Sequence, residues 1–297
     1  MKEKLTKKFY ILTSIFGVLL AGIGIAGGVI LGQEVFTPKI DYGAIDQDGI
    51  EDNQEALMKR YQKASPSSYL NSFEPYELIN ISLNKLGEHQ SVKKVTVGEV
   101  LAAGVKQEIR SYFVKDGNNY FSEILSQSSM VKVAWRFYQD ETTVNTYTGS
   151  LNNVESAKWK QDSKKDYELD AYEEAWGKTL DRGSIYIISS KTVTDGTVKE
   201  MDGNYEVSVE LDVTTSVVRY VKQMMMTSNL SKPPVFHHVQ LTFVLDKELN
   251  ALSSTADESY DVYMFGKHNS NGHITDTYVY DSNEKIPQLN EDANYEK

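Results

Sequence analysis

Cysteine is absent from the chain of 297 residues. The protein can therefore contain no disulfide bond, no thiolate zinc site and no cysteine nucleophile, and no thiol is available for the lipid anchor of a lipoprotein. Histidine is scarce, with five copies, and neither the H-E-x-x-H nor the G-x-S-x-G signature occurs. We therefore expect that the protein is not an enzyme and has no metal site and no cofactor.

Cationic side chains are outnumbered: 31 lysines and arginines stand against 42 aspartates and glutamates, which gives a net charge of −11. Non-specific binding of nucleic acid depends on cationic patches that neutralise phosphates, and the sequence shows none. We therefore expect no nucleic-acid partner. The acidic cluster at 166–174 could in principle supply a pair of catalytic carboxylates, but its spacing is typical of the solvated face of a helix.

One long apolar run is present, Phe9–Leu31, with 23 residues and no charge. About 20 apolar residues span the hydrocarbon core of a bilayer, and the lysine-rich residues 1–8 are expected to stay in the cytoplasm. We therefore expect residues 9–31 to form a single-pass signal anchor in the cell membrane, with the C-terminal part extracytoplasmic. A cleaved signal peptide is the alternative, although its apolar core is usually only about 7–15 residues long.

Three glycines in this part of the chain, Gly24, Gly28 and Gly32, recur at every fourth position. On a helix they would share one face and let a second helix approach closely, which indicates a homodimer through the membrane. Glycine is also common in transmembrane helices that do not pair, so a monomer is the alternative.

Residues 32–64 show little apolar periodicity and are interpreted as a stalk, with a short helix near 51–63. Within the stalk, Asp46, Asp48 and Glu55 match ligand positions of a calcium-binding loop. The first ligand position of such a loop is occupied by alanine here, and the helix that should precede the loop is missing. We therefore favour an acidic linker and keep calcium binding as the alternative.

Residues 65–282 are expected to form one folded domain, followed by a disordered tail at 283–297. Val133, Trp135 and Phe137 alternate with more polar residues, as in a half-buried antiparallel strand. Similar segments predict strands near 93–100, 105–115, 120–127, 131–139, 142–148, 184–193, 204–213, 235–246, 257–266 and 274–281. Amphipathic spacing predicts further helices near 71–88, 166–180 and 215–227. The predicted fold class is α+β: one transmembrane helix, then a curved antiparallel half-barrel packed on amphipathic helices.

This order of elements resembles the lipoprotein-carrier family typified by LolA and the related LppX group. The resemblance covers roughly 71–281 and rests on element order, without a short motif. It implies a half-open barrel that holds acyl chains between its strands and its helices. Carriers of this shape are soluble or lipid-anchored, so a protein anchor would favour a stationary binder or sensor over a shuttle.

Apolar side chains on the helix at 215–227 and on two strands are the candidate binding residues. Methionine adapts its shape to flexible apolar ligands, which suggests a hydrophobic slot. The expected lining is Trp135, Phe137, Val217, Val221, Met224, Met225, Leu241 and Phe243. We therefore expect a binding protein for a lipid or another hydrophobic ligand. The alternative is a cell-envelope interaction or sensory module in which the same residues are an ordinary filled core.

Overall fold

The structure is a computed structural model. It describes residues 50–102, 105–128, 132–150, 158–161, 167–176, 178–227, 230–263 and 266–291. The expected membrane anchor at 9–31, its glycine stripe (Gly24, Gly28 and Gly32) and the calcium ligands Asp46 and Asp48 lie outside these residues. Within them, no helix is both long enough and apolar enough to cross a bilayer.

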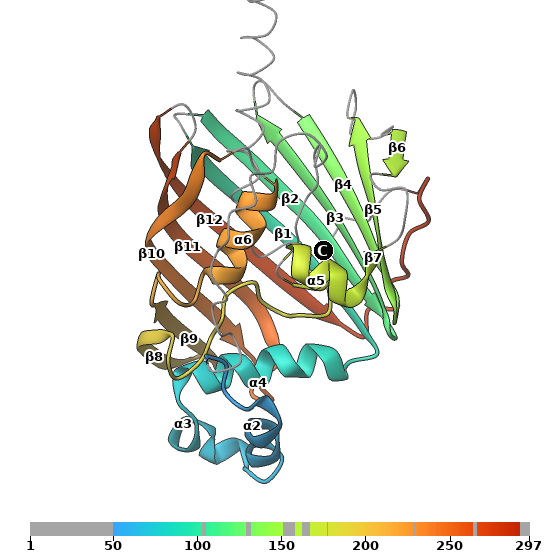
Figure 1. Cartoon of the computed structure of the whole chain (residues 1–297). Helices are drawn as coiled ribbons and strands as arrows, with labels where there is room; N and C mark the ends of the chain where they lie inside the picture. Colours follow the sequence, from blue (N-terminus) through green and yellow to red (C-terminus); the bar gives the residue numbers. More distant parts are fainter. Residues whose placement is uncertain are drawn as a thin grey trace, which may run out of the picture.

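The described chain is built on one antiparallel sheet of twelve strands (Figure 1). In chain order they are β1 (Ser91–Ala102), β2 (Val105–Asp116), β3 (Asn119–Ser128), β4 (Lys132–Gln139), β5 (Thr143–Ser150), β6 (Lys158–Gln161), β7 (Tyr167–Glu168), β8 (Val193–Met201), β9 (Asn204–Leu211), β10 (Lys232–Leu245), β11 (Ala251–Tyr263) and β12 (Lys267–Tyr280). Their spatial order is β6-β5-β4-β3-β2-β1-β12-β11-β10-β9-β8, with β7 paired to β5. The pairing of β1 with β12 joins two meanders, and β6 and β8 are the open edges.

The helices are short and cover the sheet. They are α2 (Gln54–Tyr61), the 3₁₀ turn η2 (Pro66–Ser68), α3 (Tyr69–Ser72), α4 (Pro75–Glu88), α5 (Leu169–Trp176) and α6 (Val218–Thr227). Strands make up 51% of the structure and helices 20%, so the predicted α+β class is wrong and the fold is mainly β. The predicted transmembrane helix that was part of that class is also not found in the described chain. The helical content was overestimated, because the helices of the described chain are only three to fourteen residues long.

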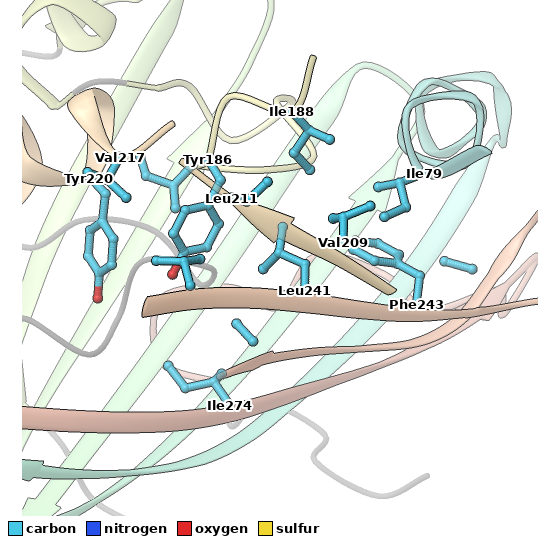
Figure 2. Close-up of a cluster of buried hydrophobic side chains, with 14 of the residues drawn as sticks. Ile79, Tyr186, Ile188, Val209, Leu211, Val217, Tyr220, Leu241, Phe243 and Ile274 are labelled. Atoms are coloured by element: carbon cyan, nitrogen blue, oxygen red, sulfur yellow. The ribbon is translucent and has the colours of Figure 1, made fainter. Parts of the chain in front are cut away.

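One face of the sheet, called the inner face here, carries the main hydrophobic core. Helices α5 and α6 lie over this face, and α4 crosses the end of the sheet near β8 and β9 (Figure 1). Figure 2 shows side chains of α4, the segment 186–188, β9, α6, β10 and β12 turned toward one another. These residues belong to one buried cluster. Burial of this cluster holds the helices on the sheet, because short helices are unstable alone in water.

The opposite, outer face of β1 to β4 is covered by the C-terminal segment. Ile286 packs on a second cluster formed by Tyr112, Val114 and Phe121. Arg136 donates hydrogen bonds to the carbonyl oxygens of residues 288, 289 and 291, at 2.6–3.1 Å. The expectation of disorder from residue 283 is therefore corrected as far as Glu291. Polar composition misled the prediction, because this segment is held by its backbone carbonyls, by Ile286 and by the ion pair of Glu284 with Lys93.

Three element predictions need correction. The segment predicted as a strand at 184–193 forms none before Val193, where β8 begins; residues 185–189 are buried and cross the inner face, and the segment bonds to neighbouring loops, as Ile187 N–H does to the carbonyl of Ser216. A short apolar run does not by itself distinguish a strand from a buried crossing segment. Strand β8 was missed because it is a polar edge strand. The polar stretch 267–272, expected as a loop, starts β12, because β1 and β11 pair with it on both sides.

The described end of the predicted stalk belongs to the folded domain. Leu57 of α2 is buried in the main core. Asp52 accepts hydrogen bonds from the backbone N–H and the hydroxyl of Ser190, both at 2.7 Å. Glu51 forms an ion pair with the buried Arg219 of α6 at 2.7 Å. Residues 50–64 therefore fasten the N-terminal helices to the inner-face cover instead of acting as a spacer.

We expect Arg136→Leu to destabilise the fold strongly. Arg136 Nε and Glu123 Oε2 are 2.5 Å apart, and both side chains are almost fully buried. Removing the guanidinium leaves Glu123 charged and buried and frees three carbonyl groups, which we expect to lower the free energy of unfolding by about 3–5 kcal/mol. Urea denaturation measures this. Arg110→Leu, an exposed site on β2, is the control and should change it by less than about 0.5 kcal/mol; equal effects would contradict the interpretation.

Candidate functional site

The structure brings the predicted slot residues into one place but leaves no room between them. Trp135, Phe137, Val217, Met224, Met225, Leu241 and Phe243 are all buried members of the main core, and Val221 packs against it. A side chain that borders a void wide enough for an acyl chain keeps solvent-accessible surface. Met224 and Phe137 each retain 1% and Trp135 retains 0%. These residues are therefore packed core in this structure.

Aromatic rings fill the space beneath α6. Tyr186, Tyr220, Phe236 and Tyr260 follow one another with ring centroids 5.6, 5.4 and 4.9 Å apart. Such separations are those of directly contacting rings. Sequence reasoning missed this stack because Tyr186 was placed in a strand.

A buried carboxyl group lies next to the stack. Glu258 of β11 accepts hydrogen bonds from the hydroxyl groups of Tyr186 at 2.6 Å and Tyr220 at 3.1 Å. Its strand neighbour Gly272 provides the room, because a Cβ there would lie 2.8 Å from the Glu258 carboxylate. Burial raises the pKa of Glu258 to about 7, against the lowering effect of the two tyrosine hydrogen bonds. The site is a satisfied core carboxyl group.

Open volume on the inner face lies instead near the C-terminal end of α4. A cavity of about 40 Å³ is enclosed by that helix end, by β1, β2, β3 and β12, and by the segment 178–183. Its apolar wall consists of Leu86, Val92, Phe113, Tyr120, Leu180 and Tyr278. Such a volume exceeds the space that one water molecule needs. We call it the inner-face pocket.

Four cationic side chains line the inner-face pocket: Lys94, Lys115, Lys178 and Arg182. Lys94 is paired with the buried Asp276 at 3.1 Å and lies 5.7 Å from the ring centre of Phe113. Strand alternation places these lysines inside. Direct partners across antiparallel strands share a face, and Lys94 pairs with Phe113 on β2 and with Tyr278 on β12.

Lys178 and Lys115 have a different environment. The ammonium group of Lys178 donates to the carbonyl oxygen of Arg182 at 3.2 Å, and that of Lys115 donates to the carbonyl oxygen of His89. Burial lowers the pKa of Lys178 to about 7, with Lys94 adding to the effect and Asp181 opposing it. Burial also lowers the pKa of Lys115. Positive charge is therefore poorly stabilised in this pocket.

Sequence reasoning did not find the inner-face pocket. Lys93 and Lys94 are consecutive in a predicted strand, so one of them had to face inward. That signal was present in the pattern. The position of Lys178 carried no signal, because it depends on how the segment after α5 crosses the sheet.

Comparison with known proteins gives weak likeness only. No family model matches the chain, and no curated protein matches it. A crystal structure of a DUF1329 family protein from Desulfovibrio piger is 12% identical, with 71% of this chain and 93% of that chain covered and a TM-score of 0.30. An N-terminal dehydratase from the difficidin assembly line is 10% identical, with 72% and 84% covered and a TM-score of 0.13. Neither likeness assigns the chain to a family. The resemblance to LolA and LppX stays one of element order.

We expect Met224→Ala to show that the predicted slot is filled. Deleting a fully packed methionine leaves a cavity, which we expect to lower the free energy of unfolding by about 2–5 kcal/mol. Chemical denaturation measures the change. Lys222→Ala on the same helix is the control and should be nearly neutral. If Met224→Ala lowers the free energy of unfolding by less than about 1 kcal/mol, there is free space beside this residue, and the result would support the predicted hydrophobic slot.

Glu258 predicts a pH dependence of stability. Its pKa is raised in the folded state, so the folded protein keeps a proton that the unfolded chain releases. The stabilisation is complete below about pH 4.5 and is lost as the pH rises through about 7, a change of about 3 kcal/mol. Glu258→Gln stays neutral at all pH values and should lack this change. The difference in unfolding free energy between wild type and Glu258→Gln, measured from pH 5 to 8, tests it; parallel profiles would contradict it.

Proposed function

We propose that this protein is a non-enzymatic binding protein that holds a ligand with an apolar body in the inner-face pocket. The observation that supports the proposal is an unfilled volume of about 40 Å³ against an apolar wall on the covered face of an open sheet. Ligand sites usually enclose roughly 300–1,000 Å³, so a ligand with an apolar chain fits here only when the cover of the pocket moves. Ligand sites are usually concave, mostly apolar and furnished with a few polar groups. The inner-face pocket has this composition, whereas the region beneath α6 is packed with aromatic rings.

The cover of the pocket provides a route of entry. On one side it is the last turn of α4, where Gly87 has no side chain and its Cβ position meets nothing within 4 Å. On the other side it is the segment 178–183, which forms no strand or helix. Segments outside the regular hydrogen-bonding ladders open at low free energy, so a ligand can enter by displacing this cover.

The second candidate is an interaction module without a ligand cavity. The filled core beneath α6 favours it, because that core needs no occupant. The two functions differ in one measurable respect: only a binding protein takes up an apolar molecule at the α4 end of the sheet.

We expect the full-length chain to bind decanol, a neutral apolar chain, by isothermal titration calorimetry. Gly87→Leu should weaken this binding by at least tenfold, because the new side chain grows into open space at the rim of the pocket. Leucine is also a better helix former than glycine by roughly 0.8 kcal/mol, so the variant should remain folded.

Glu88→Leu is the matched control. It adds the same side chain to the same helix at an exposed position outside the pocket lining, and it should bind decanol as wild type does. If wild type binds neither decanol nor the anionic chain decanoate, the proposed function is wrong. Equal decanol binding by wild type and both leucine variants would indicate that decanol binds outside the inner-face pocket.

A further inference from the structure

The inner-face pocket contains more buried positive charge than the described chain neutralises. Lys178 and Lys115 are each only 6% exposed. The ammonium group of Lys178 donates to the backbone carbonyl of Arg182, and that of Lys115 donates to the backbone carbonyl of His89. No carboxylate of the described residues lies within ion-pair distance of either ammonium group. A buried ammonium group without an anionic partner costs several kcal/mol.

The nearby carboxylates are engaged elsewhere. Asp276 accepts from Lys94 at 3.1 Å and from the hydroxyl of Thr96 at 2.6 Å. Asp181 accepts from the side-chain amide of Gln139 at 2.7 Å. The Glu173 carboxylate binds Arg182 on the surface side. The charge of the two lysines is therefore available to a group that enters the pocket, in a chain whose overall charge is strongly negative.

We propose that the inner-face pocket binds the anionic oxygens, a carboxylate or a phosphate monoester, of an amphipathic ligand through Lys178 and Lys115. The inference rests on the proposed function and names its ligand class. The ammonium groups donate to the anionic oxygens, and the rings of Phe113 and Tyr278 with the side chain of Leu86 contact the carbon atoms next to them. Ammonium–carboxylate hydrogen bonds are stronger when water is excluded.

The protonation of Lys178 gives this binding a characteristic pH dependence. Burial lowers the pKa of Lys178 to about 7. The charged groups facing it are Lys94 on β1, Asp276 on β12, and Asp181 and Arg182 on its own segment. A bound anion favours the protonated ammonium group, so the affinity for an anion should fall as the pH rises above 7. A neutral ligand has no such dependence.

The test compares three ligands on the full-length protein by isothermal titration calorimetry at pH 6.5 and pH 9. Decanoate is expected to bind at least tenfold more tightly than decanol at pH 6.5, and to lose that advantage at pH 9. Acetate supplies the carboxylate without the chain, and inorganic phosphate supplies the other anionic group. Both should bind at least tenfold more weakly than decanoate.

Lys178→Met and Lys115→Met should each reduce decanoate affinity at least tenfold at pH 6.5 and change decanol affinity by a much smaller factor, because decanol carries no charge for the ammonium group to pair with. Methionine fills a similar space without charge, so both variants are expected to fold. Lys106→Met, an exposed lysine on β2 paired with Glu99, is the control and should behave as wild type.

The outcomes separate the two proposals. Equal binding of decanoate and decanol, with no effect of either lysine variant, overturns the anion site and leaves the apolar site standing. If acetate or phosphate binds as tightly as decanoate, the result supports the lysine site and contradicts the proposal that the ligand has an apolar body. Absence of all binding overturns both.

Discussion

The pairing of β1 with β12 is the constraint on which the rest of the structure depends. It joins residues 92–102 to residues 270–280, nearly the full length of the domain apart in sequence. Without it the chain would be two separate meanders, each with another exposed edge. With it, one sheet offers a single inner face that is wide enough for α4, α5, α6 and the segment 184–193 to pack on.

The paired strands β1 and β12 also form part of the wall of the inner-face pocket. Lys94 comes from β1, whereas Tyr278 and Asp276 come from β12, and the hydrogen bond from Thr96 to Asp276 joins the two strands. A pocket made this way is placed by backbone pairing, which is more exact than placement by loops. Lys94, which lines the pocket, is thus held by the strand pairing that also holds the fold together.

Side chains alternate between the two faces of the sheet along β1, so its two consecutive lysines make different ion pairs. Lys93 points to the outer face and pairs with Glu284 of the C-terminal segment at 3.1 Å. Lys94 points to the inner face and pairs with Asp276. A shift of one residue in the register would turn each side chain of β1 to the opposite face and would separate Lys93 from Glu284 and Lys94 from Asp276.

The strands with clear alternation could be placed from the sequence: those predicted near 105–115 and 120–127 are β2 and β3. Apolar and polar residues alternate in these strands because one face of each strand is buried, which is a pattern visible in the local sequence. The crossing segment 184–193 and the edge strand β8 could not be placed, because burial of the first and pairing of the second depend on distant residues. The packing around the candidate slot could not be predicted for a related reason. Methionine at helical spacing indicates an apolar interior, but only the packing of Tyr186 and Phe236 shows that this interior is full.

The position of the pocket follows from what the inner face carries at its two ends. Beneath α6, large rings contact one another, and the hydroxyl groups of Tyr186 and Tyr220 donate to Glu258. Toward α4, the same face carries lysines, whose ammonium groups must reach acceptors at the edges of the cover. Lys115 extends to His89 and Lys178 turns back to Arg182. Flexible stems drawn toward separate acceptors cannot fill the space between them as rings do, so volume remains open where the positive charge is concentrated.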